Sequence, residues 1–556
     1  MPEITFLSAE KRLSLFVPYG VSLLDAARES GILLESPCNG NGTCGKCKVK
    51  ILQQSEDVQA DQVSPVLTKE EQQHGIILAC MTSADRDMTV EILSRQDSRN
   101  VQIIQHGIGL EVDLRTAISK RYHNTNDKTE VWAVAGLLGV EDGNTSTAHY
   151  GLVVDIGTTT LVAALFDFND GHEVGSVARL NPQSHHAQDV LSRIKLASTE
   201  SGLSVLHTEF ITVLNAMIDD LTKETSVKSK HIYEIIFSGN TCMLHLALAV
   251  DPSSLGKYPY TPAIKGGMIY QASVYGIHVA DFAQIYLPPV MSAYVGADIT
   301  SGILAAKLKE QKGLTLFVDV GTNGEMVLAA DGNLLATSTA AGPAFEGMNI
   351  EFGMRAAPGA IEKFSISDNN LIEIKTIGDK EPIGICGSGL LDIVGELVKY
   401  GFIQGTGKLK DSAVKPELAD RLVKKAGKTV FQIAGEVYLS QKDIRQVQLA
   451  KGAIRAGIEA LLAKNGVLPE QVDRVYIAGS FGYHLNPASL VHIGMLPAAF
   501  QDKIEFLGNT SKTGGQAFLL NHTVRQTMSD VVKQVEVLEL ATSANFDKLF
   551  VSCLNF

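Results

Sequence analysis

The chain has 556 residues, of which 45% are hydrophobic and 20% are charged, and its formal net charge is −13. This length allows three or four domains with cores of their own, and the composition is that of an ordinary globular protein. The negative charge argues against non-specific binding to nucleic acid or to anionic membranes. We find no apolar run of the roughly 18 residues that span a membrane and no secretory leader, so we expect a cytoplasmic protein.

Residues 1–95 are predicted to form a first unit. Residues 4–7 and 13–17 indicate a short hairpin, and residues 22–31 indicate a helix with Ser22 as its N-cap. Four of the seven cysteines also lie here, in the spacing C-x5-C-x2-C-x32-C: Cys38, Cys44, Cys47 and Cys80. In a cytosolic chain such crowding favours metal ligands over disulfides.

This spacing has one residue more in its first gap than the plant-type [2Fe–2S] pattern, and it resembles the adrenodoxin-like branch. The glycines between the cysteines allow backbone N–H groups to turn toward the negative charge of sulfide and thiolate: Gly40, Gly42 and Gly45. We therefore predict that the four cysteines bind a [2Fe–2S] cluster. A zinc site and unliganded thiols are the alternatives, although zinc more usually has two close cysteine pairs.

Residues 96–148 are predicted to be a linker or small connecting region. Residues 122–129 and 141–147 are rich in turn-forming residues, and residues 130–135 between them indicate a strand. That strand contains Trp132, the single tryptophan of the chain, for which we expect a place in a core.

The sequence Asp155-Ile-Gly157-Thr158-Thr159-Thr160 lies between two apolar runs and indicates a strand, a tight turn and a second strand. Glycine at 157 lets backbone N–H groups approach an anion, and the threonines add hydroxyl donors. Asp155 supplies a hard oxygen suited to Mg²⁺ or its waters. Taken alone, a turn of this kind is also compatible with an ordinary hairpin.

The pattern occurs a second time, as Asp319-Val-Gly321-Thr322-Asn323-Gly-Glu325, again between apolar runs. Two such turns indicate two duplicated lobes that face one ligand, at residues 149–310 and 311–556. Neither turn contains the lysine of a P-loop, and each leads into a strand rather than a helix.

Other small-residue segments follow strands or precede helices. Asn181-Pro-Gln, Gly239-Asn-Thr and Gly508-Asn-Thr-Ser are polar turns, and Gly342 and Gly387-Ser388-Gly389 lie in loops for which a packing turn is the alternative. A helix that starts after Gly-Ser-Gly offers an anion site. The late glycine pair in Gly479-Ser480-Phe-Gly482 can lie flat against an adenine ring.

The two Asp-x-Gly-Thr turns and the Gly479 segment, in that order, resemble the phosphate-1, phosphate-2 and adenosine motifs of the acetate/sugar kinase, Hsc70 and actin superfamily. With the cysteine unit added, the whole chain resembles the reductive activators of corrinoid-dependent methyltransferases. The resemblance implies a mixed α/β fold, with a β-grasp ferredoxin-like [2Fe–2S] domain (α+β) followed by a two-lobed actin-like ATPase body.

This resemblance also implies a function. Such activators pass one electron from the cluster to an inactive Co(II) corrinoid of a partner protein and restore Co(I), driven by ATP hydrolysis. A plant-type cluster has a potential of about −400 mV, and the Co(II)/Co(I) couple is lower still, so the transfer is uphill. A nucleotide between two hinged lobes favours a closed state and is suited to driving such a step.

The resemblance assigns roles to residues of this sequence. The four cysteines hold the cluster, and Asp155, Asp319 and Glu325 are the candidate catalytic residues, with Asp319 or Glu325 orienting the attacking water. Phosphate and Mg²⁺ are contacted by the two turns, through Gly157, Thr158, Thr159, Gly321, Thr322 and Asn323. The nucleoside end is lined by Gly342, Gly387, Ser388, Gly479, Ser480 and Gly482.

The expected cofactors are thus a [2Fe–2S] cluster, ATP and Mg²⁺. The expected partners are a corrinoid protein and a low-potential electron donor of the ferredoxin or flavodoxin type, and a homodimer is an assembly that the resemblance allows. Three alternatives remain: a small-molecule kinase with a redox sensor, a non-catalytic nucleotide-dependent redox switch, and an activator of 2-hydroxyacyl-CoA dehydratases.

Overall fold

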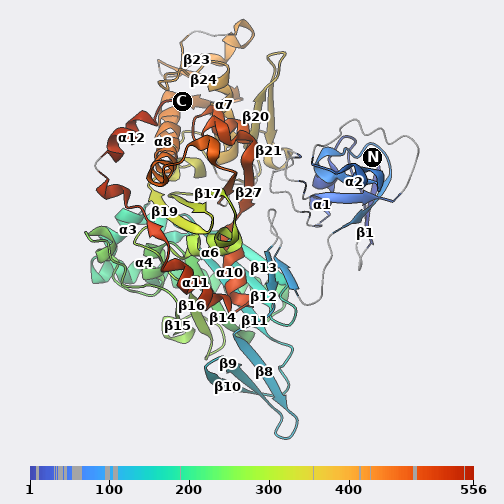
Figure 1. Cartoon of the computed structure of the whole chain (residues 1–556), viewed down its shortest axis with the longest axis vertical. Helices are drawn as coiled ribbons and strands as arrows, with labels where there is room; N and C mark the ends of the chain where they lie inside the picture. The colour runs from blue at the N-terminus through green and yellow to red at the C-terminus, as the bar shows by residue number, and fades with distance from the viewer. Residues whose placement is uncertain are drawn as a thin grey trace.

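The structure is a computed structural model (Figure 1). It describes residues 1–7, 12–30, 32, 34, 42, 45, 47–52, 66–93, 100–103, 110–187, 189–354, 356–411, 415–425, 427–479, 485–543 and 545–556. Cys38, Cys44, Gly40, Ser480 and Gly482 are therefore outside the described residues.

A five-stranded sheet in the order β2-β1-β5-β3-β4 forms the N-terminal unit. The predicted hairpin is confirmed, because β1 and β2 pair antiparallel with Ile4 opposite Leu15. Helix α1 begins after Ser22, whose hydroxyl accepts a hydrogen bond from the N–H of Asp25 at 3.1 Å, as expected of an N-cap. The elements of this unit are β1 (Glu3–Leu7), β2 (Arg12–Phe16), α1 (Leu23–Glu29), β3 (Lys48–Ile51), α2 (Lys69–Gln73), β4 (Ile76–Leu78) and β5 (Met88–Ile92).

The connecting region contains more structure than the single predicted strand. It holds the pair β6 (Asn100–Ile103) and β7 (Leu110–Asp113), and an antiparallel sheet of β8 (Ile118–His123), β9 (Lys128–Ala133) and β10 (Gly136–Asp142). The buried ammonium of Lys120 in β8 donates to the Glu141 carboxylate at 2.8 Å and to the Tyr233 hydroxyl at 2.7 Å. Because Tyr233 lies on a strand of the first lobe, this network fastens the three-stranded sheet to the body.

Two six-stranded sheets of similar order form the body, which confirms the predicted duplication. The first has the order β13-β12-β11-β14-β16-β15 and the second β27-β26-β17-β18-β19-β28. In each, an antiparallel hairpin (β11 and β12, or β17 and β18) has a third antiparallel strand on one side and two parallel strands on the other. One edge strand completes each sheet: β15 is antiparallel to β16, and β28 is parallel to β19. The bounds are β11 (Tyr150–Ile156), β12 (Thr160–Asp167), β13 (Glu173–Leu180), β14 (Ile232–Gly239), β15 (Met268–Gln271), β16 (Gln284–Leu287), β17 (Leu314–Val320), β18 (Gly324–Ala330), β19 (Asn333–Thr339), β26 (Arg474–Ala478), β27 (Ile504–Gly508) and β28 (Glu536–Val537).

Helices and two small sheets cover the body. The helices are α3 (Val190–Ala197), α4 (Glu200–Thr225), α5 (Thr241–Ala247), α6 (Ala297–Ala305), α7 (Gly387–Lys399), α8 (Gln441–Asn465), α9 (Pro487–His492), α10 (Thr510–Leu520), α11 (Val524–Val532) and α12 (Phe546–Ser552). The small sheets contain β20 (Ala360–Ile366), β21 (Ile372–Thr376) and β22 (Gly384–Ile385), and β23 (Leu422–Lys425), β24 (Lys428–Ala434) and β25 (Val437–Ser440).

Helix α10 connects the two lobes (Figure 1). It follows β27 of the second sheet, yet it packs against α6 and against β11 and β14 of the first sheet. Glycines make this approach possible: a Cβ on Gly514 would lie 2.0 Å from the carbonyl oxygen of Ser301, and one on Gly515 would lie 2.6 Å from a methyl carbon of Val153. Helix α10 therefore returns to the core of the first lobe, while the chain ends at α12, which packs against α8 of the second lobe.

One helix among the described residues, α4, has the length and apolar composition that would allow it to cross a membrane. Its buried side chains, among them Leu206, Phe210 and Leu214, belong to the hydrophobic core of the first lobe. One face of α4 thus packs inside the protein.

Candidate functional site

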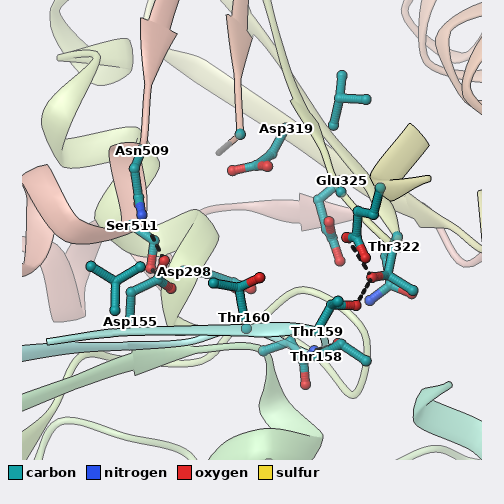
Figure 2. Close-up of a pocket in the computed structure, with 18 residues that line it drawn as sticks. Asp155, Thr158, Thr159, Thr160, Asp298, Asp319, Thr322, Glu325, Asn509 and Ser511 are labelled. Atoms are coloured by element: carbon teal, nitrogen blue, oxygen red, sulfur yellow. Dashed lines mark hydrogen bonds between the residues drawn. The ribbon is translucent and has the colours of Figure 1, made fainter. Parts of the chain in front are cut away.

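A pocket lies where the two Asp-x-Gly-Thr turns face each other (Figure 2). One turn connects β11 to β12 and the other connects β17 to β18, so each lobe contributes the same kind of hairpin. The residues that line the pocket are Asp155, Gly157, Thr158, Thr159, Thr160, Val162, Asn240, Asp298, Asp319, Val320, Gly321, Thr322, Asn323, Glu325, Glu346, Gly479, Asn509 and Ser511. The structure thus brings together the two turns that the sequence places more than 150 residues apart.

Two glycines of the pocket lie where the backbone leaves no room for a side chain. A Cβ on Gly157 would lie 2.5 Å from the carbonyl oxygen of Thr160, across the first turn. Gly479 has a φ of +118°, and a Cβ there would lie 2.4 Å from the carbonyl oxygen of Val320 in the second turn. Both positions therefore require glycine.

The two turns touch each other through threonine hydroxyls. The Oγ1 atoms of Thr159 and Thr322 lie 2.9 Å apart, and Thr322 Oγ1 also donates to a carboxylate oxygen of Glu346 at 2.8 Å (Figure 2). Thr159 belongs to the first lobe and Thr322 to the second, so this contact closes the pocket at one end. A phosphate group is an acceptor that can replace either bond.

Five carboxylates line the same pocket. Four of them are labelled in Figure 2, namely Asp155, Asp298, Asp319 and Glu325, and the fifth is Glu346, which accepts from Thr322. Burial and the neighbouring carboxylates Asp298 and Asp155 raise the pKa of Asp319 to about 8. Burial, with the charge of Asp155, raises the pKa of Asp298 to about 7, and burial with Asp298 and Asp319 raises that of Glu325 well above its ordinary value. Burial and the mutual repulsion of these neighbouring carboxylates favour their protonated forms.

This donor set fits Mg²⁺. Hard divalent cations take oxygen ligands, usually one or two carboxylates together with waters and the phosphates of a nucleotide. A cation placed among these carboxylates relieves the repulsion that raises their pKa values. The threonine hydroxyls and backbone N–H groups of the two turns offer donors for phosphate oxygens next to it.

The carboxylate of Asp155 differs from the others because it has two side-chain donors. Asn509 Nδ2 donates to one of its oxygens at 2.8 Å, and Ser511 Oγ donates to the other at 2.7 Å. Burial raises the pKa of Asp155, while these two hydrogen bonds lower it. Both donors come from the start of α10, so the segment that connects the lobes also orients Asp155.

Asn240 and Asn509 line the pocket, although neither is among the binding residues predicted from the sequence. Each follows a strand, and the side-chain oxygen of each caps a helix by accepting from the N–H three residues later, at Met243 and at Lys512. The amide nitrogen of Asn240 donates to Thr158 Oγ1 at 3.0 Å, as that of Asn509 does to Asp155. The sequence Gly-Asn-Thr occurs at both places, and this repetition is the signal that identifies them.

Two further pocket residues, Asp298 and Glu346, were missed. Asp298 lies in the first turn of α6 and Glu346 ends a short 3-10 helix, Pro343–Glu346. Neither belongs to a repeated pattern, and nothing in the local sequence distinguishes them from other acidic residues.

Three residues predicted for the nucleoside end are absent from the described lining of the pocket: Gly342, Gly387 and Ser388. The N–H of Gly342 donates to the carbonyl oxygen of Thr322 at 2.8 Å and so supports the second turn. A Cβ on Gly387 would lie 1.8 Å from the carbonyl oxygen of Phe345, and the Ser388 hydroxyl donates to the carbonyl oxygen of Glu362 at 2.9 Å. These contacts favour the packing alternative for this loop.

Two of the four cluster cysteines lie among the described residues. The Sγ atoms of Cys47 and Cys80 are 3.2 Å apart, and no disulfide joins them. Gly42 and Gly45 have φ values of +73° and +65°, the left-handed region that the cluster loop was expected to need. A close thiol pair beside glycines of this conformation fits two ligands of one iron–sulfur cluster.

Three family models match the chain in order. The 2Fe-2S iron-sulfur cluster binding domain matches residues 9–85, the RACo middle region matches residues 150–311, and the C-terminal domain of RACo, the ASKHA domain, matches residues 313–556. A solved structure, the reductive activator for corrinoid,iron-sulfur protein, is 30% identical to this chain. The likeness covers 100% of this chain and 98% of that one, with a TM-score of 0.75.

The chain belongs to the reductive activators of corrinoid proteins. The corrinoid activation enzyme RamQ of Eubacterium limosum is 29% identical over 95% of both chains. The [Co(II) methylated amine-specific corrinoid protein] reductase of Methanosarcina barkeri is 24% identical, over 73% of this chain and 77% of its own. This activator thus combines a [2Fe–2S] ferredoxin-like domain with an actin-like ATPase body, which confirms the predicted fold class and cofactors.

The carboxylates of the activator give a pH-dependent prediction. Asp298 and Asp319 have pKa values of about 7 and about 8 in the fold, against an ordinary value of 3.8, so the metal-free folded chain binds more protons than the unfolded chain between about pH 4 and 8. The free energy of unfolding that these two carboxylates contribute to the metal-free chain is therefore present at low pH and is lost as the pH rises through 7 and 8. Because Mg²⁺ binds the ionised carboxylates, we expect its addition to raise Tm more at about pH 8.5 than at about pH 6. Thermal unfolding with and without Mg²⁺ at both values checks this, and an equal rise at both would contradict it.

Proposed function

We propose that this chain binds ATP with Mg²⁺ between its two lobes and uses it to drive one electron into the Co(II) corrinoid of a partner protein, which restores Co(I). The observation that carries the proposal is the presence, in one chain, of a close cysteine pair in a ferredoxin-like domain and of two facing phosphate turns in the body. The activator structure similar to this chain over its whole length supports the same combination.

The roles that we propose for residues follow from their positions. Asp155 and Asp319, at the ends of equivalent strands, hold the cation and its waters from opposite lobes. The turns 157–159 and 321–323 bind phosphate oxygens from the two sides. Asp298 and Glu325 line the same pocket, and Asp319 or Glu325 orients the attacking water. When bound, the cluster supplies the single electron and Mg²⁺ neutralises phosphate charge.

Closure of the lobes supplies the coupling in this proposal. The Thr159–Thr322 contact shows that the turns of the two lobes can meet directly. A triphosphate bound between the turns forms bonds to both of them and so holds the two lobes in the closed state. The nucleotide state therefore sets the spacing of the lobes, and helix α10, which follows a strand of one lobe and packs on the other, transmits that change.

We also propose the division into residues 1–95, 96–148, 149–310 and 311–556, with a cytoplasmic location. The further partner in this proposal is a low-potential donor of the ferredoxin or flavodoxin type that re-reduces the cluster. A homodimer belongs to the proposal as well, whereas nucleic acid and membrane do not, in keeping with the net charge of −13.

One experiment tests the activity. The chain is purified without oxygen, its cluster is reduced, and a Co(II) corrinoid protein is added with ATP, without nucleotide, or with a non-hydrolysable ATP analogue. We expect the Co(I) absorption to appear only with ATP. Reduction of the cobalt at the same rate without ATP would contradict the proposal. A phosphorylated small molecule in place of Co(I) would instead indicate a kinase.

A further inference from the structure

Three consecutive carbonyl oxygens of the first phosphate turn accept hydrogen bonds from one short segment of the first lobe. Asn181 Nδ2 donates to Gly157 O at 2.9 Å, and the backbone N–H of Asn181 donates to Thr159 O, also at 2.9 Å. Between them, Arg193 Nη2 donates to Thr158 O at 2.6 Å. Since the N–H of a trans peptide points opposite to its C=O, fixing these carbonyls away from the pocket turns the next N–H groups toward it.

The guanidinium of Arg193 is buried, with a side chain that is 0% exposed. Beyond Thr158 it donates to the carbonyl oxygen of Ala187 at 3.0 Å and to Gln183 Oε1 at 3.2 Å, and it lies 3.0 Å from Met243 Sδ. These acceptors are all neutral. Within the described part of the chain, no carboxylate forms an ion pair with Arg193.

A buried charge without a matched opposite charge is costly, so its position calls for an explanation. Burial lowers the pKa of Arg193 to about 10, which still leaves the group positive at neutral pH. The charge lies directly behind the turn that faces the pocket. The charges of Asp189 and Glu346 raise the pKa of Arg193 but neither carboxylate forms an ion pair with it. A bound triphosphate on the other side of the turn adds two or more negative charges, which attract the guanidinium through a medium of low dielectric constant.

We infer that Asn181 and Arg193 are positioning residues that hold the first phosphate turn in its anion-binding form, and that Arg193 adds positive potential for the phosphates. This inference rests on the proposed function, since it assumes that the pocket takes a nucleotide. It also accounts for the Asn181-Pro-Gln segment, to which the sequence analysis gave no role. Neither residue lines the described pocket, so both act through the turn.

The test compares binding of ATP, ADP and AMP, each with Mg²⁺, to the full chain by calorimetry. For Arg193→Met we expect ATP affinity to fall by about 10- to 100-fold, the usual range for a hydrogen bond to a charged group. The loss should be smaller for ADP and less than about twofold for AMP, because the effect acts on the phosphates. Arg193→Lys keeps the charge but cannot reach three acceptors, so an intermediate loss is expected.

Asn181→Ser provides a second, milder variant. Serine retains an oxygen that can cap the following turn, as Asn181 Oδ1 does by accepting from Gln183 N at 3.1 Å, but it cannot reach the carbonyl of Gly157. We expect about 3- to 10-fold weaker ATP binding and little change for AMP. This variant carries the test if Arg193→Met does not fold.

Arg525→Lys is the matched control. Arg525 in α11 forms a largely buried ion pair, 2.9 Å long, with Glu234 in β14 of the first lobe, and it does not touch the phosphate turn. We expect this variant to lose stability without any phosphate-dependent change in nucleotide affinity. Equal losses for ATP and AMP in the Arg193 and Asn181 variants, or no loss at all, would overturn the inference. A wild-type chain that binds none of the nucleotides would instead overturn the proposed function.

Discussion

Replacing Asp319 with asparagine is expected to lower ATP-dependent formation of Co(I) by about 100- to 10,000-fold. The substitution preserves the shape of the side chain, but it removes the carboxylate near the end of β17 that shares the pocket with Asp155 and Asp298. The variant then holds either the cation or the attacking water less well, depending on which of them Asp319 contacts. The rate of Co(I) absorption at saturating ATP measures the effect.

Variation of Mg²⁺ separates the two roles of Asp319. If Asp319 holds the cation, a higher Mg²⁺ concentration restores part of the rate, whereas a residue that orients water gives a loss that Mg²⁺ does not relieve. Asp298→Asn and Glu325→Gln, assayed in parallel, identify the carboxylate with the second behaviour. The control is Asp392→Asn, a buried carboxylate of α7 that accepts from Ser489 Oγ at 2.7 Å outside the pocket. An Asp319→Asn rate equal to that of the control would rule out both roles.

Replacing Cys47 with alanine is expected to abolish electron transfer altogether. Cys47 is buried, and its Sγ lies 3.2 Å from that of Cys80. Without the Cys47 thiolate, the cluster has three cysteine ligands in place of four. The purified variant should lack the visible absorption of a [2Fe–2S] cluster and should contain almost no iron. ATP binding should persist, because the pocket belongs to the body of the chain.

Cys553→Ser is the control for this variant. Cys553 caps the end of α12 in the body, and it lies outside the N-terminal unit that holds the cluster. We expect it to keep its iron, its absorption spectrum and its rate of Co(I) formation. A Cys47→Ala protein that retained a ferredoxin-like spectrum would show that the cluster has other ligands.

Much of the fold was predictable because it depends on local sequence. Each Asp-x-Gly-Thr turn lies between apolar runs that form paired strands, and the hairpins β11–β12 and β17–β18 are found there. The N-cap at Ser22 and the hairpin before it follow from rules that concern a few neighbouring residues. The prediction of a single strand at residues 130–135 missed its two neighbours. Strand β8 is mostly polar, and β10 contains two glycines and no buried residue, so neither shows the alternation of a half-buried strand.

The candidate site was predicted only in part. Residues of the two turns could be found because the pattern is repeated, and Cys47 and Cys80 because of their spacing. Asp298 and Glu346 could not be found, because an acidic residue at a helix end is common in sequences of every kind. The ligand contact that the sequence pattern suggested for Ser388 stays a prediction, and in the structure its hydroxyl donates to the carbonyl oxygen of Glu362.

The sequence by itself determined the repeated turns, the cysteine spacing and the strands around them, because these features depend on residues that are neighbours in the chain. The tertiary structure decided which carboxylates share a pocket and where Arg193 and α10 lie, because those contacts join residues separated by tens to hundreds of positions. Asn509 and Ser511 reach Asp155 only because glycines let α10 pack closely on the first lobe. Close packing of this kind depends on the shapes of both surfaces, and no single segment of the sequence specifies it.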